Sequence, residues 1–459
     1  MAGTQIATYR GVAAAIAGAA AMAASCPAAA ENMLPDNWNT AAYGNSTLSF
    51  NGYTRVTVGT SGDGKTMAEF QAPGAWSKYR LGNESNTYSE LALDYHYYLD
   101  GPDDKKSRFV ELYGMLSDYE PNNRYNDVLQ DYQHLNNDNL AQSYIKLGNF
   151  LGDGVDAWFG RRYYDRHDIH MNDYYWLNSG QGAQFGGGVE GIPLAGHRLD
   201  VALFKAHDFD VNDLNGGSQT GSINTYTLDM RYRDIRTVPD GALSLWAQYA
   251  DRPASENIGF SDKQGFGFGG WHVLKNVWGG TMTSALSFRK GPTITQGPYT
   301  DLSAREDQGY DLNKAFAVEA DNDLVIDNLE KNYSVQWATV LRHEDRGCCG
   351  VQGDTIDWVS TGVRPVYYLT EHLGIATEVG LDYVDDAVLD KSGLLAKGTV
   401  ALQLAGGKGY FNRPVIRLFV TEAAWTNGLR GSIGTTPGAA PFANDTSGTT
   451  VGIQFESWW

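Results

Sequence analysis

Alternation of polar and apolar residues with a period of two constrains this chain more than any other feature. From Leu48 to Val58, polar residues at odd numbers alternate with mostly apolar residues at even numbers. The segment 451–459 also alternates, with its polar set at even numbers. Similar segments begin near Tyr88, Leu228, Leu243 and Ile375. A period of two is typical of β-strands with one apolar and one polar face. The sequence therefore predicts an all-β protein.

The alternation alone leaves two folds open, because it does not say which face is inside. A soluble sandwich buries its apolar face, whereas an outer-membrane barrel turns that face to lipid and lines its lumen with the polar one. Aromatic residues recur at strand ends on the apolar face, at Tyr95, Tyr97, Tyr249, Tyr383 and Trp459. Large side chains recur on the polar face, at Arg55, Glu90, Trp246, Arg417 and Trp458. Interfacial girdles and a lumen lining of this kind favour a transmembrane antiparallel β-barrel.

Charge and hydropathy exclude two other classes. The chain carries 35 basic and 54 acidic residues, a formal net charge of −19, which argues against a protein that binds nucleic acid without regard to sequence. Its mean hydropathy of −0.38 excludes a helical protein with several membrane spans. Aromatic residues make up 12% of the chain and there are 54 glycines, a composition that suits strands and tight turns.

The amino terminus reads as a signal peptide over 1–30. Arg10 supplies the positive region, 12–24 is a short apolar run, and Ala28 to Ala30 offer small residues for cleavage. We expect the mature domain to be one outer-membrane barrel over 31–459. Long polar segments between its strands are expected at about 61–76, 119–139, 206–224, 291–331, 343–355 and 427–449, alternating with short turns.

The three cysteines form no disulfide framework. Cys26 is a poor lipidation site because no leucine precedes it by three positions. Cys348 and Cys349 are adjacent, so they cannot close a long loop, although a strained vicinal disulfide is open to them. No zinc-site spacing surrounds the pair.

The densest group of chemically active side chains lies in 160–176. It combines arginines, carboxylates and aromatic rings, which together can hydrogen-bond hydroxyl groups and stack on the C–H faces of a sugar. His167, Asp168 and His170 could instead ligate a metal, but their spacing matches no strong motif, and we predict no metal and no cofactor. A charged surface loop is the plainer alternative. An exported glycoside hydrolase would use Asp168 and Asp173 as its acid and base.

Several segments resemble the maltoporin family of sugar-specific outer-membrane channels, in chain order. They are 50–55, 77–84 with 87–90, 160–176, 362–365, 413–419 and the terminal Trp458-Trp459. The resemblance implies a homotrimer of barrels with about 18 strands each, in contact with outer-membrane lipid and lipopolysaccharide. It also implies one long loop that folds inward and a helical track of aromatic rings that guides the sugar.

The resemblance assigns site residues position by position. Tyr53, Tyr88, Phe268, Trp358 and Trp458 match the aromatic track. Arg55, Arg80, Glu90, Arg166, Asp168 and Asp173 match the polar track, with Tyr175 as the constriction tyrosine and His170 beside it. The family's entrance tryptophan comes from a neighbouring subunit, and here that region offers only Tyr119 or Tyr125. A family arginine is missing near 142–146, and one partner of the family's loop disulfide is Ser85.

These observations predict a channel and not an enzyme. We expect facilitated diffusion of oligosaccharides, with maltose and maltodextrins first and sucrose or another oligosaccharide as the alternative. A sugar-binding structural protein is a third interpretation. We also expect low conductance and weak ion preference, because the constriction candidates carry both signs of charge. No nucleic-acid partner is expected.

Overall fold

The computed structural model describes residues 38–459, apart from 63–64, 103, 122–139, 180–184, 213–219, 296–308, 348–352, 435–441 and 443. The features predicted at Cys348, Cys349 and Tyr125, and the signal peptide expected over 1–30, lie outside the described residues. Residues Asn39–Trp459 form one compact unit, and everything below belongs to it.

Strands dominate the described part of the chain. Its first half contains β1 (Thr40–Tyr43), β2 (Ser46–Ser61), β3 (Lys65–Thr66), β4 (Asn86–Tyr98), β5 (Phe109–Pro121), β6 (Leu140–Gly148), β7 (Asp156–Arg161), β8 (Tyr164–Ile169), β9 (Tyr174–Ser179), β10 (Phe185–Leu194), β11 (His197–Asn212) and β12 (Thr220–Val238).

The second half continues the pattern. Its strands are β13 (Gly241–Arg252), β14 (Lys263–Val277), β15 (Gly280–Lys290), β16 (Phe316–Asn328), β17 (Tyr333–Asp345), β18 (Thr355–Tyr368), β19 (Leu373–Asp386), β20 (Lys391–Ala405), β21 (Val415–Trp425) and β22 (Ser447–Trp458). The short 3-10 helices are η1 (Glu256–Ile258), η2 (Gly291–Thr295), η3 (Leu329–Lys331) and η4 (Asn427–Leu429). None of the described helices is long and apolar enough to span a membrane.

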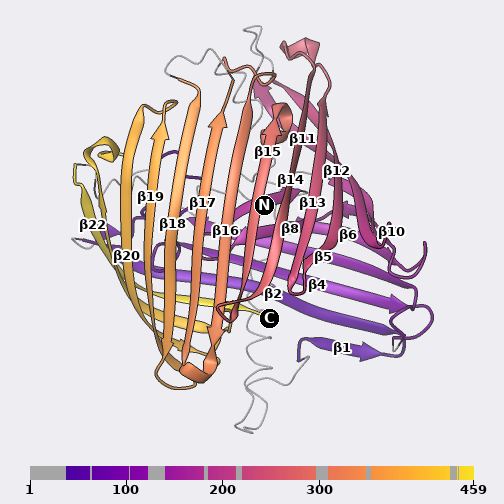
Figure 1. Ribbon diagram of the computed structural model, residues 1–459, viewed down its shortest axis with the longest axis horizontal. Coiled ribbons are helices and arrows are strands. Elements are labelled where there is room, and N and C mark those ends of the chain that lie inside the picture. Colours follow the sequence, from indigo (N-terminus) through magenta and orange to yellow (C-terminus); the bar gives the residue numbers. More distant parts are fainter. Residues whose placement is uncertain are drawn as a thin grey trace, which may run out of the picture. The chain divides into compact units, whose positions relative to one another are not determined.

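Antiparallel pairing closes the sheet on itself. Strands pair with their neighbours along the chain, as the ribbon shows from β10 through β22 (Figure 1). β22 then returns to β2, with Tyr53 opposite Trp458 and Ser61 opposite Thr450. This sheet has 20 strands. The short strands β1 and β3 pair only with the two ends of β2, and the other 18 strands form the closed barrel. The predicted all-β barrel is confirmed.

The two faces of the wall differ as the alternation predicted. On β21, buried and exposed residues alternate without interruption. Leu418 and Val420 point outward and are 62% and 52% exposed, whereas Arg417 and Thr421 point inward and are buried. An apolar outer face is what a barrel in lipid requires.

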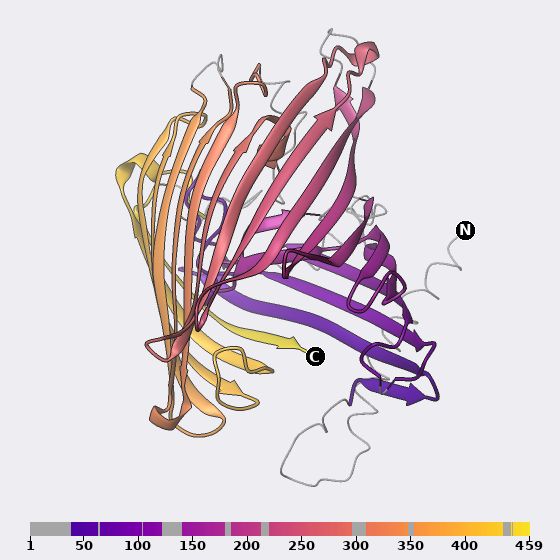
Figure 2. The ribbon, with the colours of Figure 1, turned by 45° about the vertical axis from the view of Figure 1, so that its right-hand side comes forward.

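The two ends of the barrel also differ. At one end, two-residue turns join the strands, as at Ala195–Gly196 and Trp278–Gly279, where all four residues have positive φ. Positive φ at both positions is the geometry of a type I′ hairpin turn. The opposite end carries the long connections, such as 291–315 and 426–446, and its strands rise to different heights (Figure 2).

Two predicted polar segments are wrong in their extent. Most of 206–224 belongs to strands, because β11 ends at Asn212 and β12 begins at Thr220. We expected a connection over 291–331, but Phe316–Asn328 is β16. Its inward positions carry Glu319, Asp321 and Asp323, which made the strand read as a polar loop. An acidic inner face is acceptable there because basic residues of the neighbouring strands reach it, such as Arg289 and Arg342 on Glu319.

Candidate functional site

Two segments from the long-loop end fold into the barrel and narrow it. One is 67–85, between β3 and β4, and the other is the β8–β9 hairpin with its tip at 170–173. Five of their apolar residues, Phe70, Tyr79, Ile169, Met171 and Tyr174, are at most 5% exposed. They form the main buried cluster, which lies within the barrel instead of between two sheets.

The hairpin is fastened to the wall by buried polar contacts. The Tyr174 hydroxyl donates to Glu319 Oε1 on β16 at 2.7 Å and accepts from Arg342 at 3.1 Å. Arg289 donates to the backbone carbonyl of Trp176 at 2.7 Å. On β12, the fully buried Arg231 pairs with Asp165 at 2.8 Å. Hydrogen bonds to charged groups are worth about 1.5–3 kcal/mol each, so the hairpin has a fixed position.

The segment 67–85 is held against the opposite wall. The Tyr79 ring fills the space above Gly362 and Gly380, where an added Cβ would come within 2.3 and 2.0 Å of ring carbons. Its hydroxyl lies 2.9 Å from Ser360 Oγ. The backbone N–H of Arg80 donates to the carbonyl of Met171 at 3.1 Å, which joins the two inward segments.

A row of aromatic rings follows adjacent strands of the inner wall. The rings of Tyr53 on β2 and Tyr88 on β4 are 5.9 Å apart, and the rings of Tyr53 and Trp458 on β22 are 6.3 Å apart and nearly parallel. Sequence reasoning missed its continuation at Phe411, in the turn between β20 and β21. The ring of His170 lies between Trp458 and Phe411, with centroid distances of 5.6 Å and 5.5 Å.

Phe268 does not belong to this row, and its assignment to the aromatic track is corrected. It lies on the outer face of β14 and is 54% exposed. The inward positions on either side of Phe268 are glycines, and Trp246 of the neighbouring strand occupies the space above Gly267 and Gly269. The alternation of β14 therefore points its phenylalanines toward the lipid side.

Trp358 points inward but is completely buried. Its indole Nε1 donates to Asp382 at 2.9 Å, and its ring packs edge-on against Tyr174 at 5.0 Å. The Trp76 ring of the inward segment lies 6.0 Å away on the lumen side. Trp358 is thus a packing residue behind the lining, which corrects its expected place in the track.

An ionic cluster beside Tyr53 joins the inward segment 67–85 to β2 and β22. Arg55 and Arg80 both pair with Glu84, at 2.7 and 2.8 Å. Arg80 also donates to the Tyr53 hydroxyl at 2.8 Å, and that hydroxyl donates to Glu456 at 3.1 Å. The arginines were predicted, but Glu84 and Glu456 were not. Glu456 could have been found, because it shares the inner face of β22 with Trp458.

A second polar group surrounds the hairpin. The Arg166 guanidinium lies 4.1 Å from the Tyr163 ring and 4.7 Å from the Tyr175 ring, in cation–π geometry. Within β4, the Tyr88 hydroxyl donates to Glu90 at 2.6 Å. Of the predicted polar track, Arg166 and Glu90 are therefore each engaged with an aromatic residue, and Tyr175 is one of the two rings that Arg166 contacts.

The carboxyls of Asp168 and Asp173 have opposite pKa shifts. Enclosure by surrounding protein and the nearby charge of Asp173 raise the pKa of Asp168. Enclosure also opposes ionisation of Asp173, but the Arg80 and Arg55 guanidinium groups hold the pKa of its carboxyl below the usual value. Asp173 lies 3.8 Å from Arg80, at the tip of the hairpin.

His170 lies at the tip of the β8–β9 hairpin, between two arginines. Its Nδ1 lies 3.4 Å from Arg80 and its Nε2 lies 3.2 Å from Arg413. Burial and these cations lower its pKa well below the usual value, so the ring is neutral at physiological pH. A metal shared with His167 and Asp168 gains no support, because His167 pairs with Asp165 at 3.1 Å and stacks on Trp176.

A cavity of about 570 Å³ opens on the long-loop side of this constriction. Trp76, Lys78, Arg80 and Asp173 line one side of it, and Tyr119 of β5 contributes a ring. Tyr119 is one of the two aromatic residues predicted at the entrance.

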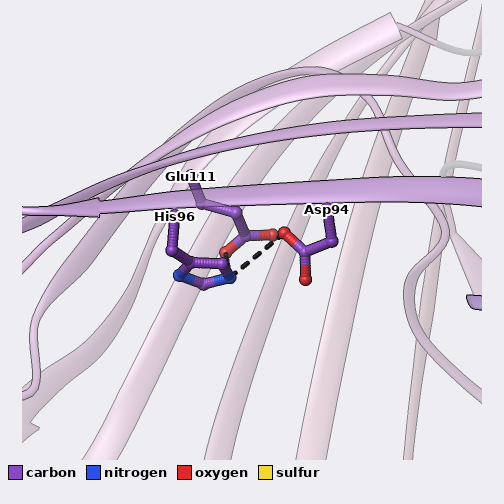
Figure 3. Close-up of side chains that lie close together, drawn as sticks. All are labelled: Asp94, His96 and Glu111. Carbon is purple, nitrogen blue, oxygen red and sulfur yellow. Dashed lines mark ion pairs between the residues drawn. The ribbon is translucent and has the colours of Figure 1, made fainter. Parts of the chain in front are cut away.

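Another cluster offers ligand atoms for a cation by distance alone. Figure 3 shows Asp94 and His96 of β4 and Glu111 of β5 pointing toward one another, and their ligand atoms lie within 4.8 Å. His96 Nε2 is 3.1 Å from Asp94 Oδ1, and the Tyr144 hydroxyl donates to Glu111 at 2.8 Å. Ion pairing and this hydrogen bond account for the cluster, and we assign it no metal.

Comparison with known proteins gives the family. The model of a family described as LamB porin matches residues 48–459. Among solved structures, Pseudomonas aeruginosa OpdK with vanillate is 13% identical with a TM-score of 0.43, covering 90% of this chain and 99% of that one. P. aeruginosa OccD3 is 9% identical (TM-score 0.43, 90% and 91% covered), and Acinetobacter baumannii OccAB2 is 11% identical (TM-score 0.41, 90% and 98% covered).

These findings correct the resemblance to the maltoporin family. The family shown for this chain is the one whose model is described as LamB porin, and the maltoporin assignment is not carried further. The barrel fold and the family match together identify an outer-membrane porin channel.

Proposed function

The chain belongs to the LamB porin family, and we propose that this outer-membrane channel is specific for oligosaccharides, which it passes by facilitated diffusion. We further propose α-glucans such as maltose and maltodextrins as the preferred class. Sucrose or another oligosaccharide is the alternative. The proposal concerns the substrate and the residues that contact it.

One observation carries the proposal: a row of rings runs along the inner wall next to an ionic cluster. Tyr88, Tyr53 and Trp458 come from three adjacent strands, with ring centroids 5.9 and 6.3 Å apart. A glucosyl chain presents flat apolar C–H faces that such rings can stack on. A pore for small ions alone needs no such row.

The polar groups beside the row complement the hydroxyl edge of a sugar. Arg55, Arg80 and Glu456 offer charged donors and acceptors within one network that includes the Tyr53 hydroxyl. Charge-assisted hydrogen bonds are stronger than neutral ones, so the network can exchange partners with successive hydroxyls. The same network orients the side chains before the sugar arrives.

Weak binding at each ring suits transport. Aromatic contacts are worth about 0.5–1.5 kcal/mol each beyond the area that they bury. Conduction requires that binding be strong enough for entry and weak enough for exit. Several weak contacts in series satisfy both conditions without any coupled energy source.

Three further parts of the proposal concern the assembly. We propose that residues 1–30 are removed as a signal peptide, that the mature barrel forms a homotrimer, and that its outer surface contacts lipid and lipopolysaccharide. The exposed apolar residues of the outer face, such as Leu286 and Leu418, support the membrane contact. Mass measurement of the purified protein tests the first two parts directly.

An exported glycoside hydrolase is the rival that a specific observation favours. The pKa of Asp168 is raised and that of Asp173 is lowered, and such a divergence suits an acid and a base. We propose a channel without catalysis, because enclosure and the neighbouring charge of Asp173 explain the raised pKa of Asp168, and the Arg80 and Arg55 guanidinium groups explain the lowered pKa of Asp173. Hydrolysis of maltodextrin or sucrose that disappears in Asp168→Asn would favour the enzyme.

Sugar block of ion current through reconstituted channels tests the proposal. We expect the affinity to rise with α-glucan length from maltose to maltoheptaose and to exceed that of an unrelated β-linked sugar. Trp458→Ala and Tyr88→Ala should each weaken binding about fivefold, the loss of roughly 1 kcal/mol. Trp278→Ala, at an exposed turn, is the matched control and should bind as the parent does. If no sugar blocks the current, the channel serves other solutes.

A further inference from the structure

The inward segment 67–85 presents one large ring to the lumen that neither the alternation nor the resemblance assigned. Trp76 is partly buried, and it lines the 570 Å³ cavity on the long-loop side of the constriction. Its neighbours Ala75 and Ser77 are buried, so the backbone on both sides of the ring is fixed. The cavity is the space that a solute entering from this side meets before the ionic cluster.

The packing behind Trp76 fixes the ring in place. The Arg342 guanidinium lies 4.4 Å from its centroid, and the Trp358 ring lies 6.0 Å away. Arg342 is itself held by Glu319 at 2.7 Å and by Glu344 at 2.9 Å. Because a buried cation and a buried indole hold the ring, it loses little freedom when a ligand stacks on it.

Trp76 therefore occupies the place that Trp358 was expected to fill. Trp358 is 0% exposed, and its indole nitrogen donates to Asp382, so a sugar cannot reach its face. Trp76 lies between Trp358 and the cavity. Of these two tryptophans, the one that reaches the cavity belongs to the inward segment and not to the barrel wall.

The polar lining of the same cavity has the composition that a sugar site needs. Lys78, Arg80 and Asp173 reach it from the constriction side, and Tyr119 adds a second ring. The Lys78 ammonium is fixed by Glu69 at 3.0 Å. A ring face with fixed donors and acceptors around it recognises a pyranose by stacking and by hydrogen bonds to its hydroxyls.

We propose that Trp76 is the entrance ring of the channel, supplied by the same subunit, on which an oligosaccharide first stacks before it passes to the constriction. Trp358 supports this ring from behind and makes no contact with the sugar. The inference rests on the proposed sugar specificity and names the entrance subsite of that pathway. It also removes the need for a tryptophan from a neighbouring subunit.

Single-channel block with sugar added to one side at a time tests the proposal. Maltohexaose added on the long-loop side should enter Trp76→Ala channels about fivefold more slowly than the parent, which corresponds to the loss of one stacking contact. Entry from the short-turn side should change much less, because the sugar reaches the row at the other end first. Trp76→Phe should restore most of the entry rate.

The outcomes separate this inference from the proposed function. A parent-like entry rate in Trp76→Ala, with binding still lost in Trp458→Ala, overturns the entrance ring and leaves the sugar channel intact. An equal loss from both sides that Phe does not restore shows a purely structural tryptophan and also overturns it. Absence of block in the parent contradicts the sugar channel itself. Trp278→Ala is the control for tryptophan loss outside the lumen.

Discussion

Tyr53 joins the two kinds of contact on which the proposed transport depends. Its ring stands in the aromatic row between Tyr88 and Trp458, while its hydroxyl accepts from Arg80 and donates to Glu456. A tyrosine at this position therefore aligns the apolar and polar edges of the pathway. Phenylalanine and alanine substitutions can separate the two contributions.

We expect Tyr53→Phe to retain sugar block within about twofold of the parent, because the ring stays. Tyr53→Ala should lose about fivefold in affinity, since the stacking contact of roughly 1 kcal/mol is removed. Titration of the block with maltohexaose measures both values. Equal losses in the two variants would show that the hydroxyl and not the ring carries the recognition.

His170 lies at the constriction but should not act as a pH gate. Its pKa is lowered by burial and by Arg80 and Arg413, so the folded channel keeps it neutral well below pH 6.5. The unfolded chain protonates near pH 6.5, so this histidine lowers stability as the pH falls below that value.

We expect the conductance of His170→Gln and of the parent to follow the same pH dependence between pH 8 and 5. The unfolding temperature of the parent should fall more steeply than that of the variant below about pH 6.5. Current recordings and thermal melts across this range check both statements. A conductance step near pH 6.5 that the variant lacks would contradict the neutral assignment.

At the level of elements, alternation predicted which strands exist and which side chains face the lumen. Tyr53, Arg55 and Trp458 lie on the inner face because their parity in β2 and β22 is unbroken. Phe268 was misassigned because β14 has glycines at its alternate, inward positions. The Trp246 side chain of β13 occupies the space above these glycines, and Phe268 points outward. That choice depends on the neighbouring strand, which one strand's sequence does not reveal.

The periodicity of the sequence could not predict how the inward segments pack. The contacts of Tyr79 with Gly362 and Gly380 join residues far apart in the chain, and the residues 67–85 follow no helical or strand period. The resemblance marked Arg80 within this segment, but only the closed barrel shows that Trp76 covers Trp358. Long-range packing therefore decided the part of the site that sequence patterns missed.

Gly380→Ala should loosen the segment 67–85. The added methyl group would lie 2.0 Å from a Tyr79 ring carbon, so the ring and the segment must move away from the wall. We expect higher conductance and weaker sugar block, by a few-fold, with the barrel still assembled. Gly398→Ala on the neighbouring β20 is the matched control, since its Cβ meets nothing within 4 Å. Identical currents in the two variants would show that Tyr79 does not position the segment.

On the scale of the whole molecule, total charge and pore charge are separate quantities. The chain carries a formal net charge of −19, yet the constriction pairs Glu456 with Arg80, Arg413 and Arg417 at 2.7–3.4 Å. The fields of paired charges largely cancel within a Debye length of about 8 Å at physiological salt. We therefore expect the parent channel to show weak ion preference.

Removing the Glu456 carboxylate, which pairs with all three arginines, should change this weak ion preference. Glu456→Gln removes the anion that the buried Arg80, Arg413 and Arg417 share. The pore should therefore become anion-selective, and the reversal potential in a tenfold KCl gradient should shift accordingly. Glu422→Gln makes the same charge change at an exposed position of β21 and should leave the reversal potential at the parent value. Strong cation selectivity in the parent, or no shift in Glu456→Gln, would mean that charges outside the constriction set the selectivity, and the balanced pore would then be wrong.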